Sequence, residues 1–417
     1  MKKHTYRQID VNNINWTKIR AQAENRDLHF CVDVAKQKFV GLLVTADSEI
    51  ICLLKWTHPQ DTLGLVERLC NGLGVARLEV VMEPSGTYGD VLRWQFTKRG
   101  IPVYRVGTKP VHDRAESYDG VPSLHDSKAA HIIAELHREG HSALWQETPA
   151  EQRNLRGLTA ELEIQQQLHR ANLNRLSALM ARYYPELECV VDLSSISVLT
   201  LLSQYGTPSE IVIHEEDAAT LLEKVGGYFL KTDKRLAILQ SAHDSLGVPC
   251  VPGEQGQIKA LAKDLLRTHQ ASMEVEKHMA QALKADEGMT NMADVTGKVT
   301  CIVLAAILGD LKKYANAASL LKALGLNLRE RSSGKHQGQL KITKRGSGKA
   351  RFYLYWLVMR LVQHDQVIKT WYERKVARDG GRFKGRALIA VMRKVVKGLW
   401  HVARGEKFDS SKLFNLA

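Results

Sequence analysis

The sequence contains few residues that could crosslink the chain. Its six cysteines are scattered over 417 residues, without a CxxC pair and without clustering with histidine. Zinc-binding modules and disulfide-stapled domains need close, regular cysteine spacings, so this distribution argues against both classes. We therefore predict reduced cysteines that serve as packing residues: Cys31, Cys52, Cys70, Cys189, Cys250 and Cys301.

Long apolar runs are also missing. No segment offers the roughly 20 consecutive apolar residues that cross a bilayer, and the opening stretch to Asp27 is polar, unlike a secretory signal. The chain also lacks low-complexity tracts and tandem repeats. With 44% hydrophobic residues, a chain of this length can fill the cores of two or three soluble domains. We expect a cytoplasmic protein.

Positive charge is concentrated near the end of the chain. The whole sequence carries a net charge of +14. Residues 331–407 contain 20 Lys and Arg against four Asp and Glu, which is a net charge of +16 and exceeds the total. Such a density suits a polyphosphate partner, either nucleic acid or an anionic membrane surface, although solvated helix faces also produce it.

Residues 27–148 show the pattern of an α/β domain. Three short apolar runs, HFCVDVA, KFVGLLVT and EIICLLKW, predict an antiparallel meander. A helix over 59–73, the strand RLEVVM, a helix after Gly86, the strand IPVYRV and a helix near Asp126 complete the order βββαβαβα. Because the later strands need helical crossovers, we predict a mixed sheet with helices on its faces. Residues 1–26 form an N-terminal extension.

Residues 149–290 are predicted to be helical. A long helix over 149–184 has apolar residues at heptad spacing, which suggests a coiled coil. Polar residues in the middle of this seam would set its register: Gln165, His169 and Asn172. A second long helix over about 255–286 has related spacing, so the two helices can pair or dimerise, and an ordinary helical bundle explains the pattern equally well. Between them, residues of about 187–252 form an inserted, mostly helical segment.

Residues 291–417 are predicted to form a last, mostly helical domain. An apolar helix within DVTGKVTCIVLAAILGD and a helix that stops at Gly325 precede a polar stretch, RERSSGKHQGQLKITKRGSGKAR, and helices through Trp356 and Trp400. Aromatic residues follow the basic stretch directly: Phe352, Tyr353, Tyr355 and Trp356. Such rings can stack on exposed bases, but their helical spacing favours core packing for most of them. The fold class is thus α/β plus α.

Three acids of the α/β domain are candidate site residues. Asp33 lies within the first apolar strand, where a carboxylate is costly unless its charge is compensated. Glu83 ends the strand RLEVVM, and Asp126 opens a helix. In a sheet of this order, the first strand and the strand after the first helix are commonly neighbours. We therefore predict that the three carboxylates converge at one edge of the sheet.

Clustered carboxylates repel one another unless a divalent cation neutralises them, and hard oxygen ligands select Mg²⁺ or Mn²⁺. Two such ions roughly 3.5–4 Å apart can stabilise both the attacking and the leaving oxygen in phosphodiester chemistry. Each acid also has a structural alternative. Asp33 could be a strand-end turn residue, Glu83 an acid near a helix, and Asp126 an N-cap.

The sequences around these acids carry a family resemblance. DVAK at Asp33, EPSGTY at Glu83 and HDSKAAHIIAEL at Asp126 resemble the three blocks of the RuvC-like DEDD domain of IS110-family transposases, which include the IS1111 subgroup and the Piv-type DNA invertases. The resemblance extends to the C-terminal domain and leaves out only the segment around 189–250. It implies a RuvC/RNase H-like N-terminal domain, with the three acids as catalytic metal ligands.

The third block departs from the family at one position. The family's block resembles D-x-K-D-A, and Ala129 occupies the position of its second aspartate. Residues three apart on a helix share a face, so that aspartate would face the same ion as Asp126, and alanine cannot bind metal. Either this copy has lost a ligand or the residue was substituted to stop catalysis, and the intact surrounding motif favours the substitution. We predict weak or absent metal-dependent cleavage, which Ala129→Asp strengthens.

The polar stretch RERSSGKHQGQ resembles the family's C-terminal transposase domain, whose S-G motif supplies a nucleophilic serine. The match implies this role for Ser333, with Ser332 as the alternative; without it, both would be loop residues. Serine needs a base, a metal or phosphate activation, and only His336 lies nearby. A composite site is implied, in which Ser333 attacks a phosphodiester activated by metal on the acids. Neighbouring cations are candidate contacts for nucleic-acid phosphates: Lys335, Lys341, Lys344, Arg345, Lys349 and Arg351.

The resemblance implies an RNA-guided, site-specific recombinase that cuts and rejoins DNA to move its own insertion sequence. Members of this family use a non-coding bridge or seeker RNA that pairs with donor and target DNA. Strand exchange implies a dimer or tetramer, with the long helices as a candidate interface, and no membrane partner is expected. Two alternatives remain. One is a RuvC-like junction nuclease that uses metal and water, and the other is a non-catalytic nucleic-acid-binding protein, suggested by Ala129 and the basic tail.

Overall fold

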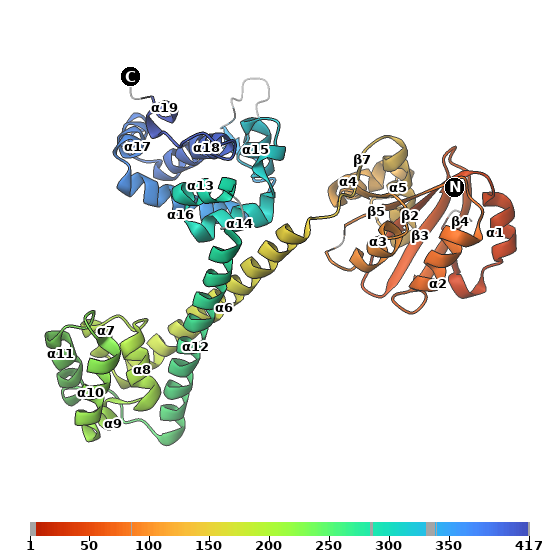
Figure 1. Cartoon of the computed structure of the whole chain (residues 1–417). Coiled ribbons are helices and arrows are strands. Elements are labelled where there is room, and N and C mark those ends of the chain that lie inside the picture. Colours follow the sequence, from red (N-terminus) through yellow and green to blue (C-terminus); the bar gives the residue numbers. More distant parts are fainter. Residues whose placement is uncertain (1–5, 85, 284–286, 331–337, 339, 416–417) are drawn as a thin grey trace. The chain divides into compact units, whose positions relative to one another are not determined.

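The computed structural model describes residues 6–84, 86–283, 287–330, 338 and 340–415. Figure 1 shows the whole chain, which divides into two compact units, Met1–Glu147 and Thr148–Ala417. Among the described residues, no helix combines the length and the apolar character that a membrane crossing requires.

The first unit is built on a seven-stranded mixed sheet with the strand order β1-β4-β3-β2-β5-β6-β7. Its strands are β1 (Gln8–Asp10), β2 (Asp27–Asp33), β3 (Lys38–Thr45), β4 (Ile50–Thr57), β5 (Arg77–Met82), β6 (Val103–Val106) and β7 (Ser142–Leu144). β2, β3 and β4 form the predicted antiparallel meander, and β5 and β6 continue beside β2 as parallel strands. The predicted mixed sheet is therefore confirmed, and it is consistent with a RuvC/RNase H-like domain.

Two edge strands and two helices of this unit were not predicted. β1 runs parallel to β4, and β7 runs antiparallel to β6. Each has only three residues, which is too short for a periodic signal. The helices of the unit are α1 (Trp16–Ala23), α2 (Thr62–Glu67, continued by a π turn over Arg68–Gly72), α3 (Asp90–Thr97), α4 (Thr108–Asp119) and α5 (Asp126–Arg138), with a 3-10 turn at Val11–Asn13. The missed helices are α1 and α4.

Helices cover both faces of the sheet, and the alternation of side chains along each strand decides which face a residue serves. Phe30 and Val80 point into the core shared with α2 and α3. Cys31 and Val81 point into the opposite core, shared with α4 and α5. On β2 and β5, odd-numbered residues therefore face α5.

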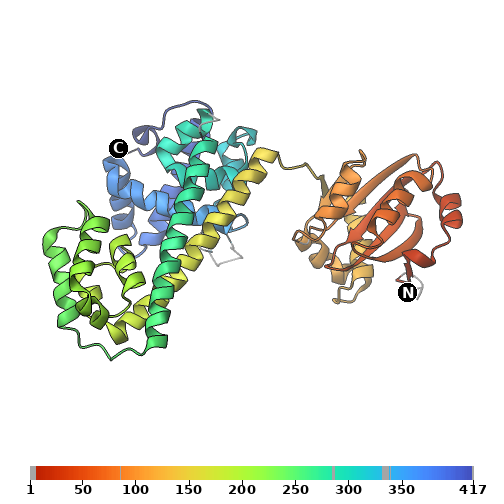
Figure 2. The same ribbon diagram turned by 60° about the horizontal axis from the view of Figure 1, so that its bottom comes forward.

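The second unit is organised around two long helices, α6 (Ala150–Tyr183) and α12 (Pro252–Leu283), which pack side by side in Figures 1 and 2. Asn172 donates to Asp264, and Nδ1 of His169 lies 3.0 Å from Oγ1 of Thr268. The contacted residue on α12 moves from 268 to 264 as the residue on α6 moves from 169 to 172, so the two helices are antiparallel. Two predicted polar residues thus join the helices within one chain, while a coiled coil between copies stays a prediction.

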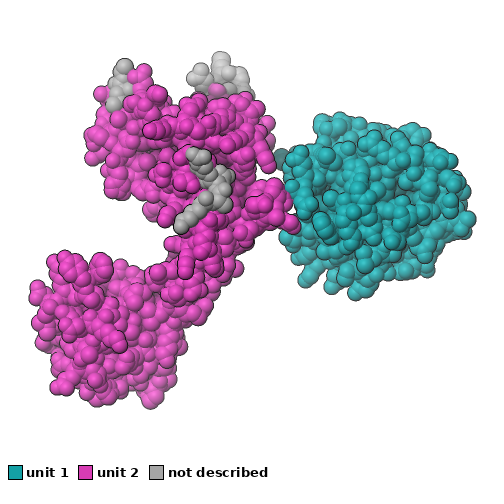
Figure 3. Space-filling model, viewed as in Figure 1, with its two compact units in different colours: residues 1–147 teal, residues 148–417 magenta. Residues whose placement is uncertain are grey.

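Each end of this helix pair carries its own hydrophobic core, and both lie within the unit that Figure 3 colours magenta. The inserted segment packs around Leu176 and Leu265. It contains α7 (Leu187–Val190), α8 (Ile196–Gln204), α9 (Pro208–Ile213), α10 (Glu215–Gly226) and α11 (Thr232–His243). The C-terminal helices pack around Leu162 and Met279. They are α13 (Glu287–Thr296), α14 (Lys298–Leu308), α15 (Ala317–Ala323), α16 (Gly348–His364), α17 (Gln366–Arg378), α18 (Lys384–Val402) and α19 (Ser410–Leu413), with a 3-10 turn at Leu311–Lys313.

Two expectations about packing were wrong in part. Three of the four aromatic residues on α16 are exposed, namely Phe352, Tyr355 and Trp356, the last with 58% of its surface in solvent. Their neighbours on the helix, Leu354 and Leu357, fill the core instead. All six cysteines are free, but Cys189 is exposed and does not serve packing.

Lys128 is buried in the first turn of α5, with only 1% of its surface exposed. Its ammonium group donates to the carboxylate of Asp119 at 2.6 Å, to the carbonyl of Val121 at 2.6 Å and to the carbonyl of Ser123 at 2.9 Å. All three N–H donors of the lysine are thus satisfied. These bonds hold the loop between α4 and α5 against the start of α5.

Replacing Lys128 with methionine keeps the length of the side chain and removes its three hydrogen bonds. Because the carboxylate and carbonyls lose their shared donor, we expect Lys128→Met to lower the midpoint of thermal unfolding by about 5–10 °C in scanning calorimetry of the full chain. Lys109→Met is the matched control, since Lys109 also lies 2.6 Å from an aspartate, Asp113, but at the surface. The control should shift the midpoint by less than about 2 °C, and equal shifts would contradict a structural role for Lys128.

Candidate active site

Three acids from three elements stand at one end of the central strands of the first unit. Asp33 is the last residue of β2, Glu83 directly follows β5, and Asp126 is the first residue of α5. β2 and β5 are parallel neighbours, and the backbone N–H of Glu83 donates to the carbonyl of Val32 at 3.4 Å. Asp33 and Glu83 therefore leave the sheet side by side, at the carboxyl ends of its parallel strands.

The electrostatics of Asp33 show that the three carboxylates interact. Burial raises the pKa of Asp33 to about 7, and the negative charges of Asp126 and Glu83 add to this increase, while a hydrogen bond from the backbone of Val34 opposes it. Burial also raises the pKa of Glu83, and a hydrogen bond from the Thr108 side chain opposes that shift. The carboxyl group of Asp33 is therefore partly protonated near neutral pH.

No described Lys, Arg or His side chain forms an ion pair with Asp33, Glu83 or Asp126. The negative charge of the cluster is therefore not balanced by these parts of the chain. Oxygen ligands in a half-buried, uncompensated acidic cluster match the preference of a hard divalent cation such as Mg²⁺ or Mn²⁺. The residues present fit such an ion.

Ala129 lies one helical turn beyond Asp126, and only 2% of its surface is exposed. It packs in the core that contains Cys31 and Val81, which are two residues before Asp33 and Glu83 on the same faces of β2 and β5. The side chain at position 129 thus points at the sheet beside the acids. An aspartate here would extend the acidic cluster, whereas alanine extends the apolar core.

Two residues that shape the acidic cluster were not anticipated. Thr108, the first residue of α4, hydrogen-bonds to the side chain of Glu83. Lys128 fixes the loop that leads into Asp126, as described above. Lys128 gave a signal that could have been noticed, because it is a cation directly before the mostly apolar helical stretch AAHIIA. Thr108 gave none, since only the tertiary fold brings it to Glu83.

The serine block falls in the second unit. Ser332, Ser333 and Lys335 lie outside the described residues. On either side of them, β8 (Leu328–Arg329) pairs antiparallel with β9 (Lys341–Ile342).

The other candidate contacts for nucleic acid divide into two groups. Lys341, Lys344 and Arg345 are exposed. Lys349 forms an ion pair of 2.7 Å with Glu163 of α6. Arg351 donates to the carbonyls of Leu324 and Gly346 at 2.9 and 3.0 Å. The last two cations therefore hold the fold together, which leaves the first three as the stronger candidates for phosphate contacts.

The pKa of Asp33 yields a test of the acidic cluster in metal-free protein. The pKa of Asp33 in the folded protein, about 7, lies above its ordinary value. Ionisation of this carboxyl group therefore lowers the free energy of unfolding. The loss grows as pH rises from about 4 and levels off above 7. Asp33→Asn removes the charge and keeps the shape. We expect the variant to be more stable than the wild type by about 1–3 kcal/mol at pH 8, and by less at pH 5, in urea unfolding with EDTA. Equal stabilities at pH 8 would contradict the strained carboxylate cluster.

Comparison with known proteins finds family matches in parts of both units. The profile of a transposase family of the DEDD, IS110 type matches residues 30–185, and the profile described as Transposase IS116/IS110/IS902 family matches residues 293–373. A similar protein is the insertion element IS116 uncharacterized 44.8 kDa protein of Streptomyces clavuligerus. It is 24% identical over 400 residues, which cover 90% of this chain and 94% of that protein.

The first matched range contains Asp33, Glu83 and Asp126, and the second contains Ser332 and Ser333. The family resemblance inferred from the sequence is therefore confirmed. The chain belongs to the IS110 family of DEDD transposases, and it is a DNA transposase.

Proposed function

We propose that this transposase is an RNA-guided, site-specific recombinase that moves an insertion sequence with Asp33, Glu83, Asp126 and Ser333 as its catalytic residues. The observation that carries the catalytic part of the proposal is the placement of three acids at one end of a parallel strand pair: Asp33 ends β2, Glu83 follows β5 and Asp126 opens α5. Repelling carboxylates at the ends of neighbouring parallel strands are costly to the fold, and such costs are typical of functional sites.

In this proposal, the three acids bind Mg²⁺ or Mn²⁺. The ion would supply charge stabilisation for a phosphodiester undergoing displacement. The contribution of the chain is to hold the oxygen ligands in position. Thr108 orients Glu83 by its hydrogen bond, and Lys128 anchors the loop before Asp126.

The proposed chemistry at Ser333 is a transesterification. The bond from the seryl oxygen to phosphorus replaces one phosphorus–oxygen bond of the DNA, and the serine proton leaves with the released DNA hydroxyl. The number of phosphoester bonds is unchanged, so the hydroxyl end of another strand can reverse the step and join a new DNA partner. Cutting and rejoining then need no external energy source.

Nucleic-acid binding is proposed for the surface near the serine block. Lys341, Lys344 and Arg345 are exposed and can contact phosphates, which position a backbone without reading its sequence. Phe352 and Trp356 on α16 are exposed as well and can stack on bases. Sequence selection by a guide RNA that pairs with donor and target DNA, and action as a dimer or tetramer, complete the proposal.

Substitution of the serine separates recombination from simple hydrolysis. Ser333→Ala should abolish strand joining and the covalent protein–DNA adduct, because the attacking oxygen is gone. Both substitutions are made in an Ala129→Asp background, and Ser332→Ala is the neighbouring control, which should keep at least about a third of the activity of the Ala129→Asp parent. The measurement is plasmid recombination in cells, together with detection of the adduct on denaturing gels. Recombination by Ser333→Ala at the level of the Ala129→Asp parent would reject the serine nucleophile, and metal-dependent nicking without an adduct would favour a junction nuclease.

Restoring the fourth acid tests the acidic site. Ala129→Asp should raise the rate of Mg²⁺-dependent strand cleavage by at least about 100-fold, since a ligand is added beside Asp33 and Asp126. Ala134→Asp is the matched control, because Ala134 is half-buried further along α5 and should give no increase. Cleavage of labelled DNA carrying the ends of the element would be timed with Mg²⁺ and with EDTA. No cleavage by either variant would favour a protein that binds nucleic acid without cutting it.

A further inference from the structure

The face of the sheet that carries the acids has a second polar cluster at its opposite end. His29 on β2 and Glu79 on β5 are paired across the two strands. Both are odd-numbered, as Asp33 and Glu83 are, and therefore face α5. His137, in the last turn of α5, completes the cluster. The elements that carry the three acids thus also carry these three residues.

The side chains of this cluster converge on one oxygen. Nε2 of His137 lies 3.0 Å from Oε2 of Glu79, and Nε2 of His29 lies 3.7 Å from the same oxygen. Potential ligand atoms of all three residues lie within 4.8 Å of one another. Glu79 is buried, and its carboxylate has polar partners at both oxygens.

Further hydrogen bonds orient these side chains. Nδ1 of His137 lies 2.7 Å from the hydroxyl of Ser142 on β7, which directs Nε2 toward Glu79. The other carboxylate oxygen of Glu79, Oε1, lies 2.5 Å from Arg77 and 3.5 Å from the hydroxyl of Tyr104. The second carboxylate oxygen, Oε2, therefore faces the imidazole rings of His29 and His137. Metal-binding histidines and carboxylates in proteins are commonly oriented by such outer hydrogen bonds.

We propose that His29, Glu79 and His137 bind one transition-metal ion of the zinc class. Two imidazole nitrogens and one carboxylate oxygen form a ligand set typical of Zn²⁺, with a fourth position for water. Imidazole ligands distinguish this site from the all-carboxylate cluster, which suits Mg²⁺ or Mn²⁺. Asp33 lies four positions beyond His29 on β2, a distance of roughly 13 Å, so the two sites are separate.

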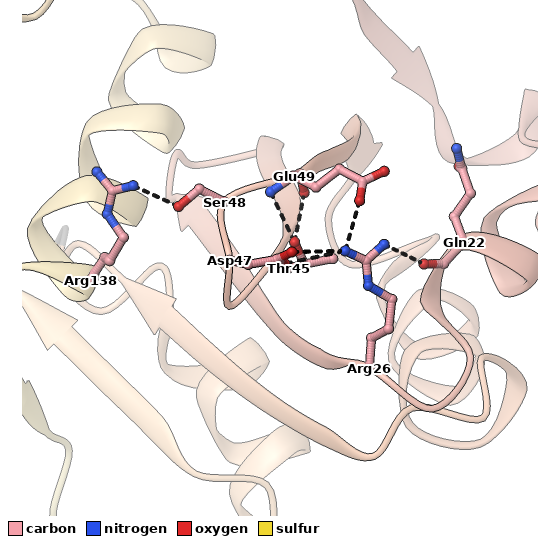
Figure 4. A network of polar contacts seen from close by, with 7 residues as sticks. All are labelled: Gln22, Arg26, Thr45, Asp47, Ser48, Glu49 and Arg138. Atoms are coloured by element: carbon pink, nitrogen blue, oxygen red, sulfur yellow. Dashed lines mark hydrogen bonds and ion pairs between the residues drawn. The ribbon is translucent and has the colours of Figure 1, made fainter.

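The neighbourhood of the proposed site is held in place by polar contacts (Figure 4). Arg138, next to His137, donates to the hydroxyl of Ser48 at 2.6 Å, in the turn between β3 and β4. Arg26 binds Asp47 and Glu49 of the same turn at 3.2 and 2.7 Å. One hydrogen bond, from Arg138 to Ser48, thus ties the end of α5 to a turn that Arg26 holds, close to the three ligands.

A bound ion would join α5 to β2 and β5 at the end away from Asp126. Since α5 spans roughly 16 Å between Asp126 and His137, fixing one end limits sliding and rotation of the whole helix. The bound metal fixes the helix on which Asp126 stands, and its fourth position stays open to water, unlike the closed four-ligand sites of purely structural zinc.

Zinc binding by the full-length, untagged protein tests this proposal. Competition with a chromophoric chelator should reveal one tight Zn²⁺ per wild-type chain. His29→Gln and His137→Gln should each weaken Zn²⁺ binding by at least about 100-fold, since losing a ligand costs more than the 10–100-fold lost with an outer partner. His243→Gln is the matched control. Nε2 of His243 lies 3.0 Å from Glu215 at the surface, and no third ligand joins this pair in the described parts of the chain. It should bind Zn²⁺ as the wild type does.

Two further measurements keep the outcome unambiguous if a glutamine variant fails to fold. Co²⁺ added to wild-type protein should give strong visible absorption typical of a low-coordinate site, and one equivalent of Zn²⁺ should remove it. Asp33→Asn should retain the Zn²⁺ site, because its carboxylate belongs to the other cluster. Absence of tight binding by the wild type would overturn the proposal, as would equal affinities in the wild type and folded His137→Gln. Neither result would bear on the catalytic role of the acids.

Discussion

The parallel pairing of β2 with β5 is the constraint on which the first unit depends. Because side chains alternate along each strand, this pairing presents His29, Cys31 and Asp33 on one face beside Glu79, Val81 and Glu83. α5 lies along the same face and adds a residue at each level. Polar groups therefore stand at both ends of an apolar middle, and the register of one strand pair determines what each end can bind.

Much of this arrangement follows from the sequence. Each of the strands β2 to β5 has six or more residues and a strong apolar pattern, so their order and the neighbouring positions of Asp33 and Glu83 were predictable. The long helices α6 and α12 were predictable for the same reason. What could not be predicted depends on single contacts between distant residues. No periodic pattern in the sequence indicates that Thr108 contacts Glu83, or that His137 contacts Glu79.

Errors of interpretation arose where two patterns competed. The aromatic residues after the basic stretch have helical spacing, but Leu354 and Leu357 fill the core and three of the four rings lie in solvent. Lys349 and Arg351 belong to a basic stretch that predicts phosphate contacts, and an ion pair and two carbonyls engage them, so their contact with phosphates stays a prediction. Charge density indicates a class of partner, but tertiary contacts decide which cations remain available.

The exposed rings on α16 have a consequence for how a complex responds to ionic strength. Attraction between cations and phosphates weakens steeply as salt is added, because it is driven by release of counterions. In the proposed nucleic-acid complex, stacking of a base on Phe352 or Trp356 would remove apolar surface from water, a contribution that simple salt does not screen. A protein that combines both kinds of contact retains part of its affinity for nucleic acid at salt concentrations where a purely ionic complex dissociates.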